Sequence, residues 1–254
     1  MLLFRLTILL PFLLISSGVW AQPKPDEILT QLDQSYYYPQ NHGLEKLTAR
    51  IQWEQLDPTS GKYWRNPDFI FAWDREGGRE IRDFKLAKDE NLVTMSRDGE
   101  LEKQIQIYGE LIIPLTLKQK FAHYHGKLNK VGRSKTRLLY HSDSLKEQIE
   151  SYSLLVSMKD MFIEEIRFEQ NLDPRKVSGS FRYQKRGDKW VAVESWSSFA
   201  IGGLNYQETS NYHYKKFDGI WLVHRIDQTV KQDGQIIQSH RFKVLDVATD
   251  FSRN

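Results

Sequence analysis

Two Asp-Gly pairs divide the last third of the chain into three long predicted strands. The strands cover Leu204–Phe217, Ile220–Val230 and Gln235–Val247, and the pairs between them are Asp218-Gly219 and Asp233-Gly234. An Asp-Gly pair adopts the positive φ angles of a two-residue hairpin turn at little cost. This part of the chain is therefore expected to fold as an antiparallel meander with tight turns.

Earlier in the chain, apolar and polar residues alternate with a period of two. In Leu47–Glu54 every odd position is apolar and every even position is polar, so a strand here would place one face on a core and the other in water. Phe69, Phe71 and Trp73 repeat this spacing. Further strands are expected at Glu80–Phe84, Leu101–Ile107, Thr136–Tyr140, Tyr152–Met158, Phe162–Phe168, Gly179–Gln184 and Lys189–Phe199.

The sequence predicts fewer helices than strands, and two further hairpin turns. Asp26–Tyr38 is predicted to be helical because its apolar residues recur on one face. A second helix is predicted at Ile113–Ala122, with Pro114 in its first turn. Asp98-Gly99 and Gly187-Asp188 are expected to turn further hairpins, and the basic stretch 127–137 is expected to be a solvated strand pair or loop.

The predicted elements favour one architecture. Aromatic residues make up 13% of the 254-residue chain, a content that favours strands. We predict a mainly β (α+β) fold, in which a single large curved antiparallel sheet forms an incomplete β-barrel and two or three helices cover its concave face. No repeat and no Pro- or Gly-rich linker interrupts the chain, so residues 22–254 are expected to form a single domain.

Residues 1–21 have the pattern of a signal peptide. Leu6–Ile15 is almost wholly apolar, a positive charge precedes it, and small residues stand at −3 and −1 of a cut after Ala21. An uncleaved anchor is the alternative, but Pro11 and Ser16-Ser17 interrupt a run that would need about 20 apolar residues to span a bilayer. Export of a chain without cysteine fits a bacterial periplasm.

Composition and motifs exclude several function classes. The formal net charge of +3 is too small for a dedicated nucleic-acid binder. The lack of cysteine removes thiolate nucleophiles and thiolate metal sites, and no serine-hydrolase elbow, phosphate loop or zinc-protease motif is present. His123 and His125 are interpreted as surface residues, because zinc normally needs three or four ligands. We therefore expect no catalytic residue, no metal and no cofactor, with a hydrolase as a distant alternative.

One segment resembles a known family. The run Tyr214-Lys215-Lys216-Phe217-Asp218-Gly219-Ile220-Trp221-Leu222-Val223 is similar to a Lys-x-x-Asp-Gly-x-Trp-x-Pro segment of the LolA-like outer-membrane lipoprotein-sorting superfamily, with Val223 where Pro is usual. The order of helix, aromatic strands and final meander resembles that superfamily too. The resemblance implies an incomplete barrel that encloses an apolar cavity for acyl chains.

A stripe of apolar residues is the candidate binding site. Ile51, Trp53, Phe69, Phe71 and Trp73 are expected to share one face of neighbouring strands. Three further candidates are Trp196, Leu222 and Phe242. An ordinary packed core explains the same pattern, whereas a curved sheet with few helices favours a cavity. An acyl chain would gain about 0.8 kcal/mol for each buried methylene, so such a site needs no polar motif.

Two functions from different classes remain open. The first is a periplasmic, non-enzymatic carrier of lipid or lipoprotein acyl chains. The second is a structural or interaction module that uses the same sheet to dock within an envelope assembly. Expected partners are acyl chains and an inner- or outer-membrane envelope component, and the protein is expected to be a monomer that binds no nucleic acid.

Overall fold

The computed structural model describes residues 23–252, apart from 58–59, 77–78, 88–108 and 145–146. The helices are α1 (Pro25–Ser35), the 3-10 helix η1 (Pro39–His42) and α3 (Leu117–Lys120), and residues 109–112 are also helical. The strands are β1 (Leu44–Leu56), β2 (Tyr63–Arg65), β3 (Phe69–Glu76), β4 (Arg79–Leu86), β5 (His125–Val131), β6 (Lys135–His141), β7 (Ile149–Ser157), β8 (Phe162–Gln170), β9 (Lys176–Arg186), β10 (Lys189–Ile201), β11 (Leu204–Phe217), β12 (Ile220–Gln232) and β13 (Gln235–Phe251).

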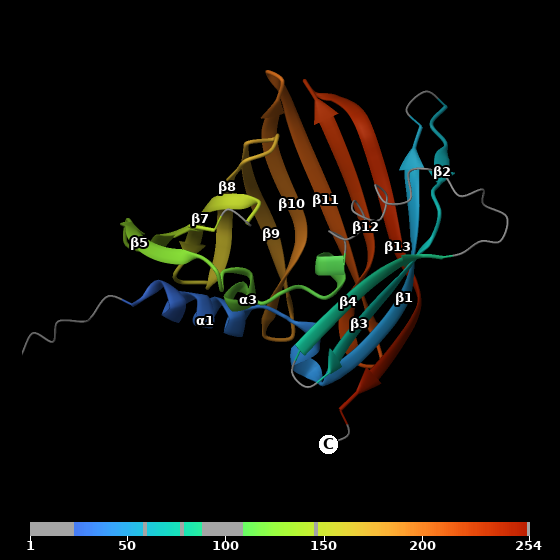
Figure 1. The fold of residues 1–254 in the computed structure, drawn as a ribbon, viewed down its shortest axis with the longest axis horizontal. Coiled ribbons are helices and arrows are strands. Elements are labelled where there is room, and N and C mark those ends of the chain that lie inside the picture. The colour runs from blue at the N-terminus through green and yellow to red at the C-terminus, as the bar shows by residue number, and fades with distance from the viewer. Residues whose placement is uncertain (1–22, 58–59, 77–78, 88–108, 145–146, 253–254) are drawn as a thin grey trace, which may run out of the picture.

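All strands in the described part of the chain belong to one antiparallel sheet of 13 strands. Their order is β4-β3-β1-β13-β12-β11-β10-β9-β8-β7-β6-β5, with β2 paired to β1. The sheet curves but does not close, since β4 and β5 lie at opposite ends of this order (Figure 1). The predicted fold class, a mainly β chain with one large curved sheet and few helices, is confirmed.

The two Asp-Gly turns adopt the predicted conformation. Asp218 and Gly219 have φ angles of 45° and 91°, and Asp233 and Gly234 have φ angles of 48° and 86°. Positive φ at both central residues defines the hairpin turn whose twist matches the twist of the flanking strands. The turn at Gly187-Asp188 is confirmed as well, because Arg186 pairs directly with Lys189.

The second predicted helix is wrong in extent. Instead of a helix over Ile113–Ala122, the chain forms only the four-residue α3, and Pro114 lies in a non-helical stretch before it. The Asp33 side chain of α1 accepts hydrogen bonds from the backbone N–H groups of Leu117 (2.7 Å) and Lys118 (3.1 Å) and so sets where α3 begins. The predicted strand Leu101–Ile107 and the turn Asp98-Gly99 lie outside the described residues.

Two apolar clusters lie on the same face of the sheet, which we call the inner face. The β1 core consists of Leu44, Leu47, Ala49, Ile51, Trp53, Phe69, Phe71, Trp73, Ile112, Ile113, Ile220, Leu222, Val223, Ile226, Phe242 and Val244. The α1 core consists of Ile28, Leu29, Leu32, Phe121, Leu138, Tyr140, Tyr152, Leu154, Val156 and Ile163. Directly paired residues share a face and neighbours along a strand alternate, so the register can be followed from one cluster to the other.

A band of polar residues separates the two cores. Ser195 pairs with Ser210 and with Phe181, and Ser210 pairs with Gln228. The hydroxyl oxygen of Ser195 lies 2.8 Å from that of Tyr212, which packs against the β1 core. Glu208 lies two residues from Ser210 on the same face. The inner face is therefore apolar in the two cores and polar between them, in the middle of β10 and β11.

Candidate functional site

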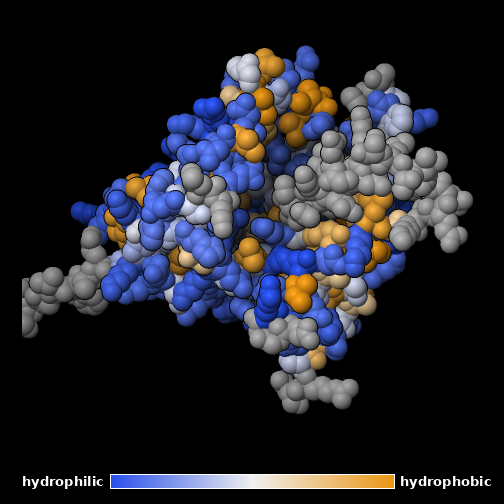
Figure 2. Space-filling view, viewed as in Figure 1, coloured by the Kyte–Doolittle hydropathy of each residue, from blue (hydrophilic) through white to orange (hydrophobic). Residues whose placement is uncertain are grey.

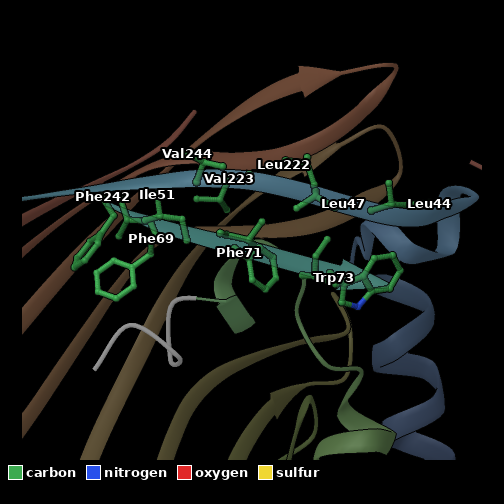
Figure 3. Packing of buried hydrophobic residues seen from close by; sticks show 14 of the residues in the cluster. Leu44, Leu47, Ile51, Phe69, Phe71, Trp73, Leu222, Val223, Phe242 and Val244 are labelled. Atoms are coloured by element: carbon green, nitrogen blue, oxygen red, sulfur yellow. The ribbon is translucent and has the colours of Figure 1, made fainter. Parts of the chain in front are cut away.

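Seven of the eight candidate residues lie together in the β1 core. Ile51, Trp53, Phe69, Phe71, Trp73, Leu222 and Phe242 are all members of this cluster, and each is between 0% and 6% exposed. Figure 3 shows six of them, Ile51, Phe69, Phe71, Trp73, Leu222 and Phe242, together on β1, β3, β12 and β13. The alternation in Leu47–Glu54 therefore identified a real apolar face.

Strand pairing brings the candidates into contact. Ile51 pairs with Phe69 on β3 and with Val244 on β13, and Trp53 pairs with Phe242. The rings of Trp53 and Phe242 are stacked with their centroids 5.6 Å apart. The β1 core thus combines the N-terminal strands with the last two strands of the chain.

Trp196 lies on the opposite, outer face. It pairs with Thr209 and Ser180, while its neighbour Ser195 faces inward, and its exposed fraction is 39%. The cause is a register shift between Ala192 and Glu194. An extra residue at such a bulge reverses which positions point inward. The structure therefore does not bring Trp196 together with the other seven residues.

The β1 core has a thin cover among the described residues. Ile112 and Ile113 pack on it from residues 109–114, which we call the cover segment. Gly109 lies against the Phe84 and Phe71 rings so closely that a Cβ atom there would overlap with Phe84. The close approach of this backbone therefore requires glycine.

Polar side chains hold the cover segment at its C-terminal end. The buried Gln40 amide donates a hydrogen bond of 2.6 Å to the carbonyl oxygen of Pro114. The Arg82 guanidinium donates to the carbonyl oxygen of Ile113 and forms an ion pair with Glu80 at 3.0 Å. The cover is thus attached by a few directional bonds in addition to its apolar contacts.

Two titratable groups lie along the polar side of the β1 core. The Trp53 indole N–H donates to Nδ1 of His240 at 3.1 Å, and burial lowers the pKa of His240 below its usual value. On β11, burial raises the pKa of Glu208 above its usual value. Both effects favour the uncharged side chain. The face next to the β1 core therefore carries two polar side chains whose burial disfavours the charged form.

The α1 core is closed by a regular helix. Ile28, Leu29 and Leu32 of α1 are buried against β6, β7 and β8. The hydroxyl group of Tyr36 accepts a hydrogen bond of 2.7 Å from the backbone N–H of Ile163, and burial raises its pKa to about 12. This end of the inner face is filled by protein.

Two clefts open on other parts of the sheet. One of about 340 Å³ is lined by Trp196 and by serine, threonine and glutamine side chains of β9, β10 and β11. The other, of about 850 Å³, lies over β5 to β8 and includes His125, His141 and Asp143. These three side chains are well exposed, as predicted for His125. Across the described residues, no group of three or more His, Asp or Glu is arranged to hold a metal ion.

Ile112 and Ile113 were not among the candidate residues predicted from the sequence. They form the described cover of the β1 core, and the apolar pair directly before Pro114 was the only local signal. Val244 and Ile226 were missed as well, although they follow the period-two pattern of β13 and β12.

No helix within the described ranges is both long and apolar enough to cross a bilayer.

Comparisons with known proteins find similarity in structure but not in sequence. No protein-family model matches the chain, and no curated protein matches it in sequence. Solved structures that are similar include a LolA superfamily protein of Nitrosomonas europaea (9% identity, TM-score 0.32, 91% of this chain and 96% of that chain) and a DUF1329 family protein of Desulfovibrio piger (9%, 0.38, 90% and 92%). A third is an outer membrane lipoprotein-sorting protein domain of Vibrio parahaemolyticus (8%, 0.33, 90% and 93%).

The first and third of these structures carry the names of the LolA-like lipoprotein-sorting superfamily that the sequence resembles. At these scores the likeness says nothing about a ligand or a partner. The candidate function therefore depends on the inner face itself.

Proposed function

We propose that the chain is a non-enzymatic carrier of lipid or lipoprotein acyl chains in the bacterial periplasm, exported after removal of residues 1–21. The observation that carries this proposal is the β1 core. It is a large apolar face on an open sheet, and its described cover is a short segment rather than a second sheet or a long helix. The described part of this cover contributes two buried side chains, Ile112 and Ile113.

The chemistry of the inner face supports an amphiphilic ligand. Aliphatic and aromatic side chains of the β1 core match an acyl chain, whose burial contributes about 0.8 kcal/mol per methylene. The polar band beside the core, with Ser195, Ser210 and Glu208, supplies hydroxyl and carboxyl groups for a polar head group. No covalent step is needed for this function.

Binding of a fluorescent apolar probe tests the proposal. Purified protein should bind N-phenyl-1-naphthylamine, and a long-chain fatty acid should displace it, because an apolar site gains free energy from a ligand that fills it. Trp73→Ala should weaken probe binding. Leu154→Ala is the matched control, since Leu154 is equally buried but belongs to the α1 core.

The same measurement can contradict the proposal. If the parent protein binds no probe, and native mass spectrometry of protein purified from its own envelope finds no lipid, the carrier function is wrong. Equal loss of probe binding in Trp73→Ala and Leu154→Ala would show a general loss of structure instead of a site in the β1 core.

A second candidate is favoured by the tight packing of the β1 core. Seven candidate residues are at most 6% exposed, as in a core that never opens. An envelope interaction module would use the sheet for docking and keep this cluster dry. Native mass spectrometry that finds a bound protein and no lipid would favour this function.

A further inference from the structure

The two ends of the strands differ in chemical character. At one end, the turns are flanked by charged residues such as Arg186, Lys189 and Lys216. At the other end, the adjacent hairpins β10–β11 and β12–β13 carry Ile201, Leu204, Ile236 and Ile237, which are between 37% and 51% exposed. Figure 2 shows apolar residues at the top of the molecule, where the tips of these two hairpins lie in Figure 1.

The two tips form one surface. Strands β11 and β12 are paired along their length, and Tyr206 pairs with Gln232 next to the second turn. The backbone N–H of Asp233 in that turn donates to the carbonyl oxygen of Asn205 at 3.4 Å. We call Ile201, Leu204, Ile236 and Ile237 the tip patch.

We propose that the tip patch docks on the surface of a phospholipid bilayer, with the β10–β11 hairpin entering its interfacial region. The 13 residues from Ser195 to Gln207 contain no charged side chain. An uncharged hairpin end can enter the head-group boundary without burial of a charge, which would be costly there.

Residue types along the hairpin follow the layers of a bilayer surface. Ile201 and Leu204 flank the Gly202-Gly203 turn at the very tip. Phe199 and Tyr206, stacked with centroids 5.5 Å apart, lie two residues back, about 7 Å from the tip. Aromatic side chains favour this interfacial depth.

A cation follows the aromatic pair. Lys231 is exposed and pairs with Gln207, three residues or about 10 Å from the tip. This distance is comparable with the 5–10 Å depth to which apolar faces enter the head-group boundary, roughly where lipid phosphates lie. Asp233, in the neighbouring turn, is the acidic residue beside this surface. The order of aliphatic, aromatic and basic groups favours a lipid surface over a protein partner.

Co-sedimentation with vesicles tests this docking. The parent protein should sediment with vesicles of phosphatidylethanolamine and phosphatidylglycerol. Ile201→Asp combined with Leu204→Asp should weaken binding by about tenfold or more, since two aliphatic side chains would no longer enter the bilayer. Ile201→Ser with Leu204→Ser should have the same direction without added charge.

Val131→Asp is the matched control. Val131 is 39% exposed, comparable with Ile201, but lies on β5, the strand at one edge of the sheet and away from β10 and β11. This variant should bind vesicles like the parent. Circular dichroism should show the same strand content and melting temperature in all variants.

Several results would overturn the docking proposal. They are a parent protein that does not sediment with vesicles, an equal loss in Val131→Asp, or a parent dimer that the tip variants dissociate without any vesicle binding. The proposal does not depend on the acyl site, since the tip variants should bind N-phenyl-1-naphthylamine like the parent. Failure of docking can thus be distinguished from failure of the carrier function.

Discussion

The two apolar cores lie on the same face of one sheet but are covered in different ways. The α1 core lies beneath the regular helix α1, whose residues Ile28 and Leu32 are fully buried. The β1 core is larger, yet its described cover consists of Ile112 and Ile113 in the cover segment. A helix fixes its contacts along a regular backbone, whereas a short segment depends on a few side chains such as Gln40 and Arg82.

This difference suggests a division of roles within one sheet. Regions with few buried contacts open at a lower free energy than regions held by regular elements. The α1 core would then keep the sheet folded, while the β1 core would open to a ligand.

The largest effect is expected from Leu32→Ala in the α1 core. Leu32 is fully buried beneath α1, and a regular helix cannot collapse into the space left behind, so the free energy of unfolding should fall by about 2–5 kcal/mol. Urea denaturation measures this change. As a control, Leu172→Ala at an exposed loop position should change it by no more than about 0.5 kcal/mol. A loss below about 1 kcal/mol for Leu32→Ala would contradict a stabilising role for the α1 core.

A smaller loss is expected from Trp73→Ala, although tryptophan is the larger side chain. The cost of a cavity depends on how well its walls can close. Because the β1 core lies under a short segment, we expect a loss of about 1–2 kcal/mol instead of the roughly 3–5 kcal/mol typical of a rigid core. A loss in that upper range, measured by the same urea titration, would remove the distinction between the cores.

The smallest effect is a pH dependence that belongs to the β1 core. Burial lowers the pKa of His240, so the unfolded chain takes up a proton first as the pH falls below about 6.5. Stability is therefore complete above that pH and declines on acidification toward the folded-state pKa, by at most about 1.4 kcal/mol per pH unit. His240→Gln should reduce this slope, as judged from urea midpoints between pH 7 and pH 5.

His224 provides an independent check of that slope. Burial also lowers the pKa of His224, whose Nδ1 lies 2.8 Å from the carbonyl oxygen of His213. The double variant with His224→Gln should reduce the slope further. None of the ten buried residues of the α1 core is a histidine. A slope in the double variant equal to that of the parent would contradict the assignment.

Local patterns predicted the hairpins and most strands. The Asp-Gly turns were found because their conformation depends on two adjacent residues, and the alternation in Leu47–Glu54 correctly identified the face that becomes buried. Most strand positions were correct, although β13 extends to Phe251, beyond the predicted end at Val247. Information within a few residues is sufficient for features of this kind.

Features that depend on distant contacts were not predictable in the same way. The start of α3 depends on Asp33, far away in the chain. The orientation of Trp196 depends on a bulge between Ala192 and Glu194, which period-two alternation does not reveal. The short, exposed β2 was not predicted because it carries no burial pattern. The assignment of the seven buried candidates to acyl binding stays a prediction.

The pairing of β1 with β13 has a consequence for biogenesis. The ion pair between Glu54 and Lys243, 2.6 Å long, joins positions 189 residues apart. During vectorial synthesis, β1 and β3 emerge long before the strand that completes their sheet. Contacts between residues so far apart in sequence form slowly. The edge of β1 that pairs with β13 therefore stays unpaired in the meantime and is prone to aggregation. The chain is thus expected to need a holding chaperone until β13 has been synthesised.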